Sequence, residues 1–414
     1  MMQPHENSSD EPDPAPRPYS QSGEIDRIKL RAMPRALFLS PVDMRTKNGM
    51  AQLQHQLLST LCSIYGDRVD LLSLAASPAR ARSWLHGVGL RVNVLGGLYP
   101  TLAWLNTMLW YGGGVILCNK LHWIDRFHFP LRTPLPRTWI KRYDTLVCFY
   151  PWAYHLLRLD RVAENVIVDT GDVMADRHER IGARRWISLA FRDERAIIKS
   201  RSKCLAVSVD DADEFERLYG ERLPVQSFVP PEHQQLIALA AAERPKRLGY
   251  MGAPGYGNEQ LLRSLAAREF LDCLALAGIE FVVAGGICNT IDPRILRAIK
   301  KGGARILGPT PSTVDYYREI SATVNPVGPS TGVKIKSVET LVAGRHLVTT
   351  RWGADRELAA AFPEQITFIN WPEDPSELGK LCVRVIKEAR PSSAATSENY
   401  VRRVTLESME MLKP

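Results

Sequence analysis

The chain of 414 residues has a net charge of +8, with 45% hydrophobic and 24% charged residues. This composition excludes a disordered protein, and the length predicts two or three domains with large cores. The seven cysteines form no Cys-x-x-Cys pair, and their odd number favours reduced thiols over a disulfide framework. We therefore expect a cytoplasmic protein.

The basic excess lies in the first half of the chain. Residues 35–222 include 26 basic and 19 acidic residues, which predicts an anionic partner for this half. The sequence has no zinc-finger spacing, RNP-like aromatic string or dense basic run, so nucleic acid is disfavoured. An anionic membrane surface fits better. Residues 1–34 are rich in Pro, Ser, Asp and Glu, which predicts a disordered leader and not an export signal.

Short apolar runs alternate with helical patterns along the first half. This alternation predicts a mainly parallel sheet with helices on both faces. In such a sheet the turn from the first strand to the first helix lies at a ligand-binding edge, and Asn48-Gly49 occupies that turn. A purely structural turn is an equally good interpretation of this pair. The predicted strands are 36–40, 69–74, 114–118, 145–150, 165–169 and 204–209.

Residues 96–117 contain no charged side chain and include Trp104, Trp110 and Tyr111. The stretch is long enough to span a bilayer, but Pro100 and three consecutive glycines interrupt it, which disfavours a transmembrane helix. We favour an amphipathic helix that lies on a membrane surface, with a helix buried under the sheet as the alternative. The flanking cations are Arg80, Arg82 and Arg91.

Polar side chains follow the predicted strand at 165–169. Asp172 and Arg177 lie in the loop after it, at the edge where α/β sheets present functional side chains. Asp169 with Asp172 is also consistent with a magnesium site, because carboxylates are ligands of that ion. Farther on, residues 229–244 contain paired prolines and a polar run, which predicts a linker between two domains.

The second half starts the alternation again. A strand ending at Met251 is followed by Gly252, two further glycines and a helix that begins near Asn258. Glycines at this place let phosphates approach the backbone. The sequences EFVVAGG and ARILG supply further strands, and a capping box at Ser312 and Asp315 starts the next helix.

Residues 322–350 read as a strand, a Gly-Pro-Ser-Thr-Gly turn, a short helix and a second strand. The first turn of a helix has unpaired N–H groups and a partial positive charge, and Lys334 and Lys336 add to it, so this end suits a phosphate. Lys336, Glu339 and Thr340 share one helix face, which places a carboxylate for sugar hydroxyls beside a cation. A surface ladder of charges is the alternative interpretation.

The same unit resembles the C-terminal signature of the group-1, family 4-like glycosyltransferases. The matching residues are Gly332, Lys334, Lys336, Glu339 and the sequence TLVAGRHLVTT that follows. Thr340 and His346 depart from the signature, and Thr331 stands where many relatives have a second Glu that helps to hold the donor sugar. Residues 169–172 resemble a family segment, Asp-x-His-Asp, in which Gly171 replaces the His.

The resemblance implies an α/β chain with two Rossmann-like domains facing a cleft, known as the GT-B fold. Residues 35–228 would form the acceptor side and residues 245–390 the nucleotide-sugar side, while a helix within 391–414 would pack back on the first domain. The implied reaction moves a sugar from a nucleotide-diphosphate donor to an acceptor hydroxyl, with retention of configuration and without a metal or another cofactor. The implied acceptor is a glycan or a lipid-linked precursor of bacterial surface glycans.

The resemblance also implies a role for each site residue. Lys334 and Lys336 would stabilise the departing diphosphate, and Asp172 would orient the acceptor. The implied donor-binding residues are Gly252, Asn258, Gly308, Thr310, Thr331, Gly332, Glu339 and Thr340, and those on the acceptor side are Asn48, Gly49 and Arg177. Gly171 and Thr331 also motivate a second hypothesis, a non-catalytic relative that binds nucleotide sugars. A hydrolase with paired carboxylates is a third, and it would leave the phosphate-binding end unused.

Overall fold

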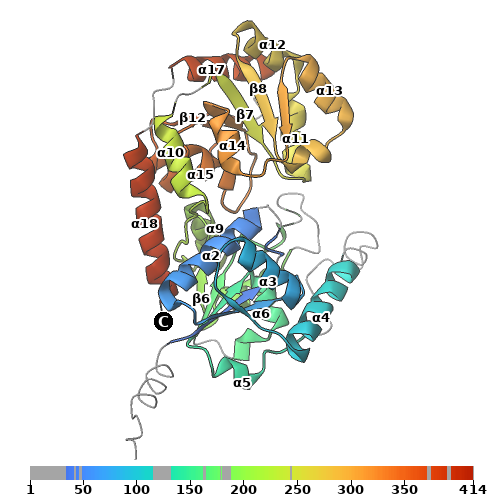
Figure 1. Cartoon of the computed structure of the whole chain (residues 1–414), viewed down its shortest axis with the longest axis vertical. Helices are drawn as coiled ribbons and strands as arrows, with labels where there is room; N and C mark the ends of the chain where they lie inside the picture. Colours follow the sequence, from blue (N-terminus) through green and yellow to red (C-terminus); the bar gives the residue numbers. More distant parts are fainter. Residues whose placement is uncertain are drawn as a thin grey trace, which may run out of the picture. The chain divides into compact units, whose positions relative to one another are not determined.

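Two six-stranded parallel sheets organise the chain, one in each half (Figure 1). The computed structural model describes residues 34–41, 43–45, 49–114, 132–161, 165–177, 179, 188–242, 245–370, 374–388 and 393–413. Residues 35–414 form one unit. The predicted α/β class with two Rossmann-like domains is therefore confirmed.

The first sheet has the strand order β3-β2-β1-β4-β5-β6, and neighbouring strands are parallel. Every residue of β1, β2, β4 and β5 is buried, as expected of parallel strands covered on both faces. The strands are β1 Ala36–Ser40, β2 Val69–Ser73, β3 Asn93–Val94, β4 Thr145–Phe149, β5 Val166–Asp169 and β6 Lys203–Leu205.

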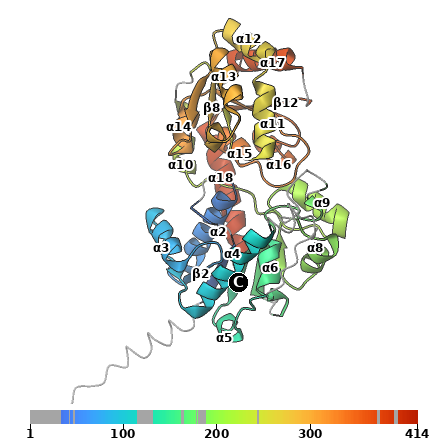
Figure 2. The same cartoon turned by 90° about the vertical axis from the view of Figure 1, so that its right-hand side faces the viewer.

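Helices lie on both faces of this sheet (Figures 1 and 2). Helix α2 (Gly49–Tyr65) buries Leu53, Leu57 and Leu61, and their four-residue spacing puts all three on the face that packs against the core. The other helices of this half are α3 Pro78–Gly87, α4 Leu98–Gly114, α5 Arg137–Ile140, α6 Pro151–Leu156, α8 Phe191–Ile198 and α9 Val209–Tyr219.

The second sheet repeats the topology of the first. Its order is β12-β11-β10-β7-β8-β9, so each sheet follows the 3-2-1-4-5-6 order of dinucleotide-binding folds when its strands are counted from its own first strand. The strands are β7 Arg247–Met251, β8 Glu280–Ala284, β9 Arg305–Gly308, β10 Ala322–Asn325, β11 His346–Thr349 and β12 Ile366–Phe368. Ligands of such sheets bind at the carboxyl edge where the strand order reverses, which here lies between β1 and β4 and between β7 and β10.

The helices of the second half alternate with its strands. They are α10 His233–Ala238, α11 Tyr256–Leu265, α12 Arg268–Leu276, α13 Pro293–Lys301, α14 Thr313–Arg318, α15 Ile335–Val342, α16 Arg356–Ala361 and α17 Pro375–Glu388. The last helix, α18 (Ala394–Leu412), returns to the first half and lies along α2 (Figure 1). The Tyr65 hydroxyl donates to the carbonyl of Leu412, and the Ser397 hydroxyl donates to the carbonyl of Leu341 in α15. Helix α18 therefore connects α2 with the helix that follows the glycine turn.

Three details differ from the predicted elements. Gly114, the first residue of the strand predicted at 114–118, ends α4, and the other four residues of that prediction lie outside the described part. The strand predicted at 204–209 ends at Leu205, because Ser208 caps α9. Strand β3 was not predicted, since two residues are too short to show a period. Within the described part of the chain, no helix combines the length and hydropathy needed to span a bilayer.

Candidate active site

The carboxyl edge of the second sheet brings glycine backbones close together. Gly252 follows β7, Gly285 follows β8, and Gly308 ends β9. The amide of Gly285 donates to the carbonyl of Gly308 at 2.8 Å. A Cβ on Gly285, which has φ +95°, would lie 2.3 Å from the carbonyl oxygen of Gly252. Only glycine therefore fits at position 285.

The turn between β10 and α15 contains the predicted phosphate site. Gly332 has φ +80°, a conformation in which other residues are strained. Lys334 is the N-cap residue of α15, and its ammonium donates to the carbonyls of Thr331 and Gly332 at 2.9 and 2.5 Å. The lysine therefore folds back over the turn and places its charge at the positive end of the helix.

Lys336 reaches across to the first strand of this sheet. Its ammonium donates to the side-chain oxygen of Asn258 at 3.0 Å and lies 4.9 Å from the ring centre of Tyr250. Burial lowers the pKa of Lys336 to about 8, although Glu339 acts in the opposite direction. Lys336, predicted to stabilise the departing diphosphate, is thus in direct contact with the predicted donor-binding residue Asn258, which is 78 positions away.

Glu339 lies one turn along the same helix and is buried. Its carboxylate accepts a hydrogen bond from the Tyr317 hydroxyl at 3.2 Å, and it also bonds the side chain of Gln52 from α2. Burial raises the pKa of Glu339 to about 8, and these two hydrogen bonds oppose the rise. Thr340 is fully buried, and its hydroxyl donates to the Lys336 carbonyl at 2.6 Å. This geometry places Thr340 inside the packing of α15 and not at a ligand surface.

In the first half, the loop after β5 presents Asp172. Its carboxylate forms an ion pair with Arg177 at 2.7 Å and accepts the amide of Val173 at 2.8 Å. The preceding Gly171 has φ +64°, and a Cβ there would lie 2.5 Å from the ring of Tyr150. The Tyr150 side chain also forms a hydrogen bond with Arg177. The aromatic ring therefore fills the space that a histidine at position 171 would need.

The glycine turn of the second half meets carboxylates of the first half. Asp211, in the first turn of α9, accepts the amide of Gly332 with both carboxylate oxygens, at 3.0 and 3.1 Å. The Ser208 hydroxyl also donates to Asp211 at 2.9 Å. A Cβ built on Gly332 would lie 3.4 Å from the carboxylate of Asp172. The carboxyl group of Asp211 therefore already accepts the backbone N–H group that the sequence predicts to bind phosphate.

Burial governs the charges of this cluster. It raises the pKa of Asp169 to about 7, partly offset by the amide of Gly171, and Asp211 raises it further. Burial and the nearby Asp172 raise the pKa of Asp211. The hydrogen bond from the Gly332 amide and the charge of Lys334 partly offset this rise. The pKa of Lys334 is lowered by burial, against the attraction of these carboxylates. Burial thus acts against the charged form of Asp169, Asp211 and Lys334 alike.

The structure gathers the predicted residues into two contacting groups. Asp172, Arg177, Gly332 and Lys334 lie around Asp211, while Lys336, Asn258 and Glu339 lie on the other side of α15. Gly308 and Thr310 belong to neither group: Gly308 ends β9, and Thr310 lies two residues beyond it. Gly49 starts α2, and a Cβ there would lie 2.8 Å from the side chain of Ile335. Asn48 is outside the described residues.

A cavity of about 30 Å³ lies beside the Asp211–Gly332 contact, bordered among others by Asp210, Thr331 and Lys334. This volume holds about two water molecules. Among the residues that the structure describes, no three His, Cys, Asp or Glu side chains converge as a metal site would require.

Sequence reasoning missed Asp211, Tyr150 and Gly285. Ser208 and Asp211 have the spacing of a capping box, and this signal predicts a helix start without revealing a contact 121 residues away. Tyr150 ends an apolar run, and no local pattern shows its positive φ of 72°. Gly285 belongs to a Gly-Gly pair that the sequence placed at a strand end.

Comparison with known proteins supports the fold. No protein-family model matches the chain, and no curated protein matches it by sequence. WaaG, a glycosyltransferase involved in lipopolysaccharide biosynthesis, is 14% identical with a TM-score of 0.55 over 91% of this chain and 99% of its own. Anabaena HepE, solved in complex with UDP-glucose, is 13% identical with a TM-score of 0.55 over 91% and 98%. TarM is 10% identical with a TM-score of 0.59 over 92% and 96%. The chain thus has the two-domain GT-B fold.

Proposed function

We propose that the protein is a glycosyltransferase that moves a sugar from a nucleotide-diphosphate donor to an acceptor hydroxyl. The observation that carries this proposal is the glycine turn at Gly332, whose N–H group already binds a carboxylate and whose neighbour Lys334 lies at the start of α15. A helix start with free N–H groups and lysines suits a diphosphate. HepE, which shares the fold, binds UDP and UDP-glucose.

In this reaction the chief demand is to stabilise the charge that develops on the leaving diphosphate. The amide of Gly332, Lys334 and Lys336 supply positive charge that is already in place. Glu339 holds the ribose, and Thr331 meets the sugar with a hydroxyl that has no hydrogen-bond partner in the described structure. The backbone at Gly308 and Thr310 faces the base, while Gly252 lets the phosphates approach.

The acceptor hydroxyl approaches from the first half. Asp172 orients this hydroxyl, and Arg177 holds Asp172 in place through the ion pair. The sugar is transferred with retention and without a metal ion, and an oxygen of the leaving phosphate takes the acceptor proton. We assign residues 35–228 to the acceptor domain and residues 245–390 to the donor domain.

Donor binding replaces the contact between Asp211 and Gly332. The carboxylate of Asp211 takes the N–H group that a phosphate oxygen needs, and the cavity beside it is too small for a nucleotide. The donor therefore binds after the two halves separate at this point, and they close again around it before the chemistry. Until the donor binds, the carboxyl group of Asp211 accepts the Gly332 amide and interacts with the charge of Lys334.

We infer that the acceptor is a glycan or a lipid-linked precursor of bacterial surface glycans such as exopolysaccharide. The protein would act in the cytoplasm, at the inner face of the cell membrane. Its basic first half supports an anionic membrane partner and no nucleic acid. WaaG, of the same fold, is involved in lipopolysaccharide biosynthesis.

The test is to measure release of the nucleoside diphosphate with and without a lipid-linked sugar acceptor. A glycosyltransferase releases it much faster with acceptor present. Equal release with and without acceptor would indicate a hydrolase. Nucleotide binding without any release would indicate the non-catalytic relative, for which the Tyr150 ring in place of a histidine at position 171 is the supporting observation.

A further inference from the structure

One face of α4 exposes four leucines in a row. Leu98 and Leu109 are 76% and 74% exposed, and Leu102 and Leu105 are 50% and 43% exposed. At 3.6 residues per turn these positions fall within an arc of about 60° around the helix axis. The stripe runs along most of a 17-residue helix, which lies on the outside of the first half (Figures 1 and 2). An apolar row of this kind on a surface helix marks an interaction site.

The opposite face of α4 is fixed to the first half. Ala103 and Thr107 are fully buried, and the Tyr99 hydroxyl donates to the carbonyl of Thr133 at 3.0 Å. The side-chain amide of Asn106 donates to the Thr133 hydroxyl at 2.8 Å. The helix is therefore held in one orientation, with the leucines directed away from the core.

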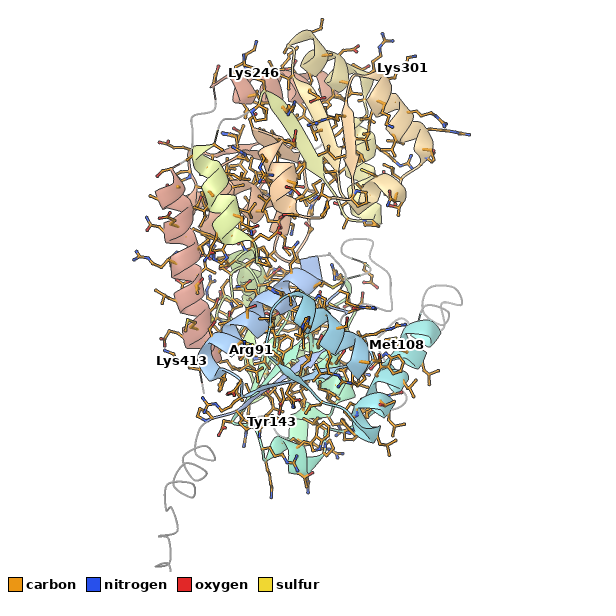
Figure 3. The ribbon with its side chains drawn as sticks, in the orientation of Figure 1. Arg91, Met108, Tyr143, Lys246, Lys301 and Lys413 are labelled. Atoms are coloured by element: carbon orange, nitrogen blue, oxygen red, sulfur yellow. The ribbon has the colours of Figure 1, made fainter. Side chains whose placement is uncertain are left out.

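Cations lie beside the leucine stripe. Tyr99 of α4 packs edge-on against Trp139 of α5, with 5.1 Å between ring centres. Arg137, Lys141 and Arg142, in and directly after α5, are all exposed. Figure 3 labels Met108 on α4 and Tyr143 just after these cations. Helix α4 has no charged residue, and residues 132–143 contain basic residues but no acidic one. The surface thus combines an apolar stripe on α4 with three exposed cations on the side of α5.

We propose that the four leucines of α4 and the three cations near α5 form a docking face for an anionic lipid bilayer. A helix with an apolar stripe and neighbouring cations lies flat at the boundary between headgroups and acyl chains, where leucines enter the hydrocarbon and cations contact anionic headgroups. This docking face would be the membrane contact of the proposed glycosyltransferase. Only its role, which is to bring the enzyme to a lipid-linked acceptor, rests on the proposed function.

The bilayer is favoured over a protein partner by the chemistry of the face. A protein groove that accepts an amphipathic helix covers its leucines but needs no cations of a single sign beside them. The charges here match a continuous negative surface, which extends beyond any single pocket.

Flotation of the full chain with phosphatidylcholine vesicles, with and without phosphatidylglycerol, tests the proposal. We expect recovery with the anionic vesicles and a loss at high salt. Leu98→Glu/Leu109→Glu should weaken vesicle binding about tenfold or more, because two charges would enter the hydrocarbon. The matched control is Leu276→Glu/Leu406→Glu, two leucines that are 89% and 59% exposed elsewhere on the surface; it should bind as the parent does.

The cations are tested in the same way. Arg137→Glu/Lys141→Glu should reduce binding to anionic vesicles about tenfold or more, while Lys300→Glu/Lys301→Glu on α13, where Figure 3 labels Lys301, should not. The proposal is overturned if the parent binds no vesicles, if it binds neutral vesicles equally well, or if each control loses as much binding as its test variant. It is also overturned if the parent is a dimer that Leu98→Glu/Leu109→Glu converts to monomers, because the stripe would then cover a second copy.

Nucleotide binding separates this proposal from the proposed function. A thermal shift with UDP, GDP or ADP, measured for the parent and for all four variants, reports the donor site alone. If a nucleotide binds and vesicles do not, the docking face is wrong and the enzyme proposal stands. Vesicle binding without any nucleotide binding would contradict the enzyme proposal and leave the docking face supported.

Discussion

The two halves of the chain share one strand order but present opposite charges at corresponding edges. After β5 and β6 the first sheet presents Asp172 and Asp211, whereas after β10 the second presents the amide of Gly332 with Lys334. The edges meet through the hydrogen bonds between Asp211 and Gly332. The difference shows that the topology supplies a place for chemistry, while the few residues after each strand decide which charge it presents.

The largest effect is expected from removing Lys334 and Lys336, the two cations beside the Gly332 turn. Lys334→Ala/Lys336→Ala should lower turnover on the order of 10²-fold or more, because the two positive charges that stabilise the leaving diphosphate are lost. Acceptor-dependent release of the nucleoside diphosphate measures this loss. Lys300→Ala/Lys301→Ala, on the far helix α13, is the matched control and should keep parent turnover. Full turnover in the first double variant would show that the lysines have no catalytic role.

Gly171→Ala tests the loop after β5, which presents Asp172. The new Cβ would lie 2.5 Å from the ring of Tyr150 and would adopt φ +64°. Gly220→Ala is the control, because Gly220 has φ +70° and nothing lies within 4 Å of its added Cβ. Both variants have the conformational cost of about 1 kcal/mol. The clash should cost Gly171→Ala about 2 kcal/mol more in the free energy of unfolding.

Urea unfolding of the two glycine variants measures the difference. If the two variants are equally stable, the Tyr150 ring moves aside at little cost. The ring would then not explain why Gly171 stands where the family segment has a histidine.

The burial of the negative edge predicts a pH dependence of stability. Asp169 has its pKa raised to about 7, whereas in the unfolded chain it is near 4. The folded state binds the extra proton, so this contribution is complete below about pH 4 and is lost as the pH rises through 7. Asp169→Asn should remove this loss, so that its free energy of unfolding rises relative to the parent by about 2–3 kcal/mol between pH 5 and pH 8.

Urea unfolding at several pH values measures this gain. Asp67→Asn, at an exposed carboxyl, should follow the parent curve. Parallel curves for the parent and Asp169→Asn would mean that Asp169 does not titrate in this range.

The smallest effect is expected from Asp211→Asn. The amide side chain still accepts the N–H group of Gly332 but no longer supplies a negative charge that competes with phosphate. Binding of UDP, or of whichever nucleotide raises the melting temperature, should tighten about threefold. Asp213→Asn is the control. Asp213 forms an exposed ion pair with Arg356 of α16, so its loss weakens a contact between the halves without touching the turn. If nucleotide binding tightens equally in both variants, the effect comes from a weaker contact between the two halves and not from the Gly332 amide.

The sequence predicted most of the fold because its signals are local. Four strands of the first sheet are fully buried and mostly apolar, and the turn at Gly332 combines glycine, lysines and a helix start within a few residues. Residues of the site that depend on distant contacts could not be predicted. Asp211 meets Gly332 across 121 positions, and Gln52 reaches Glu339 from the other half. A single sequence carries no pattern that links such positions.

A crystal structure with the bound nucleoside diphosphate would show directly what occupies the Gly332 amide. We expect the diphosphate to bind this amide with Lys334 and Lys336 beside it, and Asp211 to have left it. A diphosphate bound elsewhere, with Asp211 still accepting both hydrogen bonds from Gly332, would contradict this expectation.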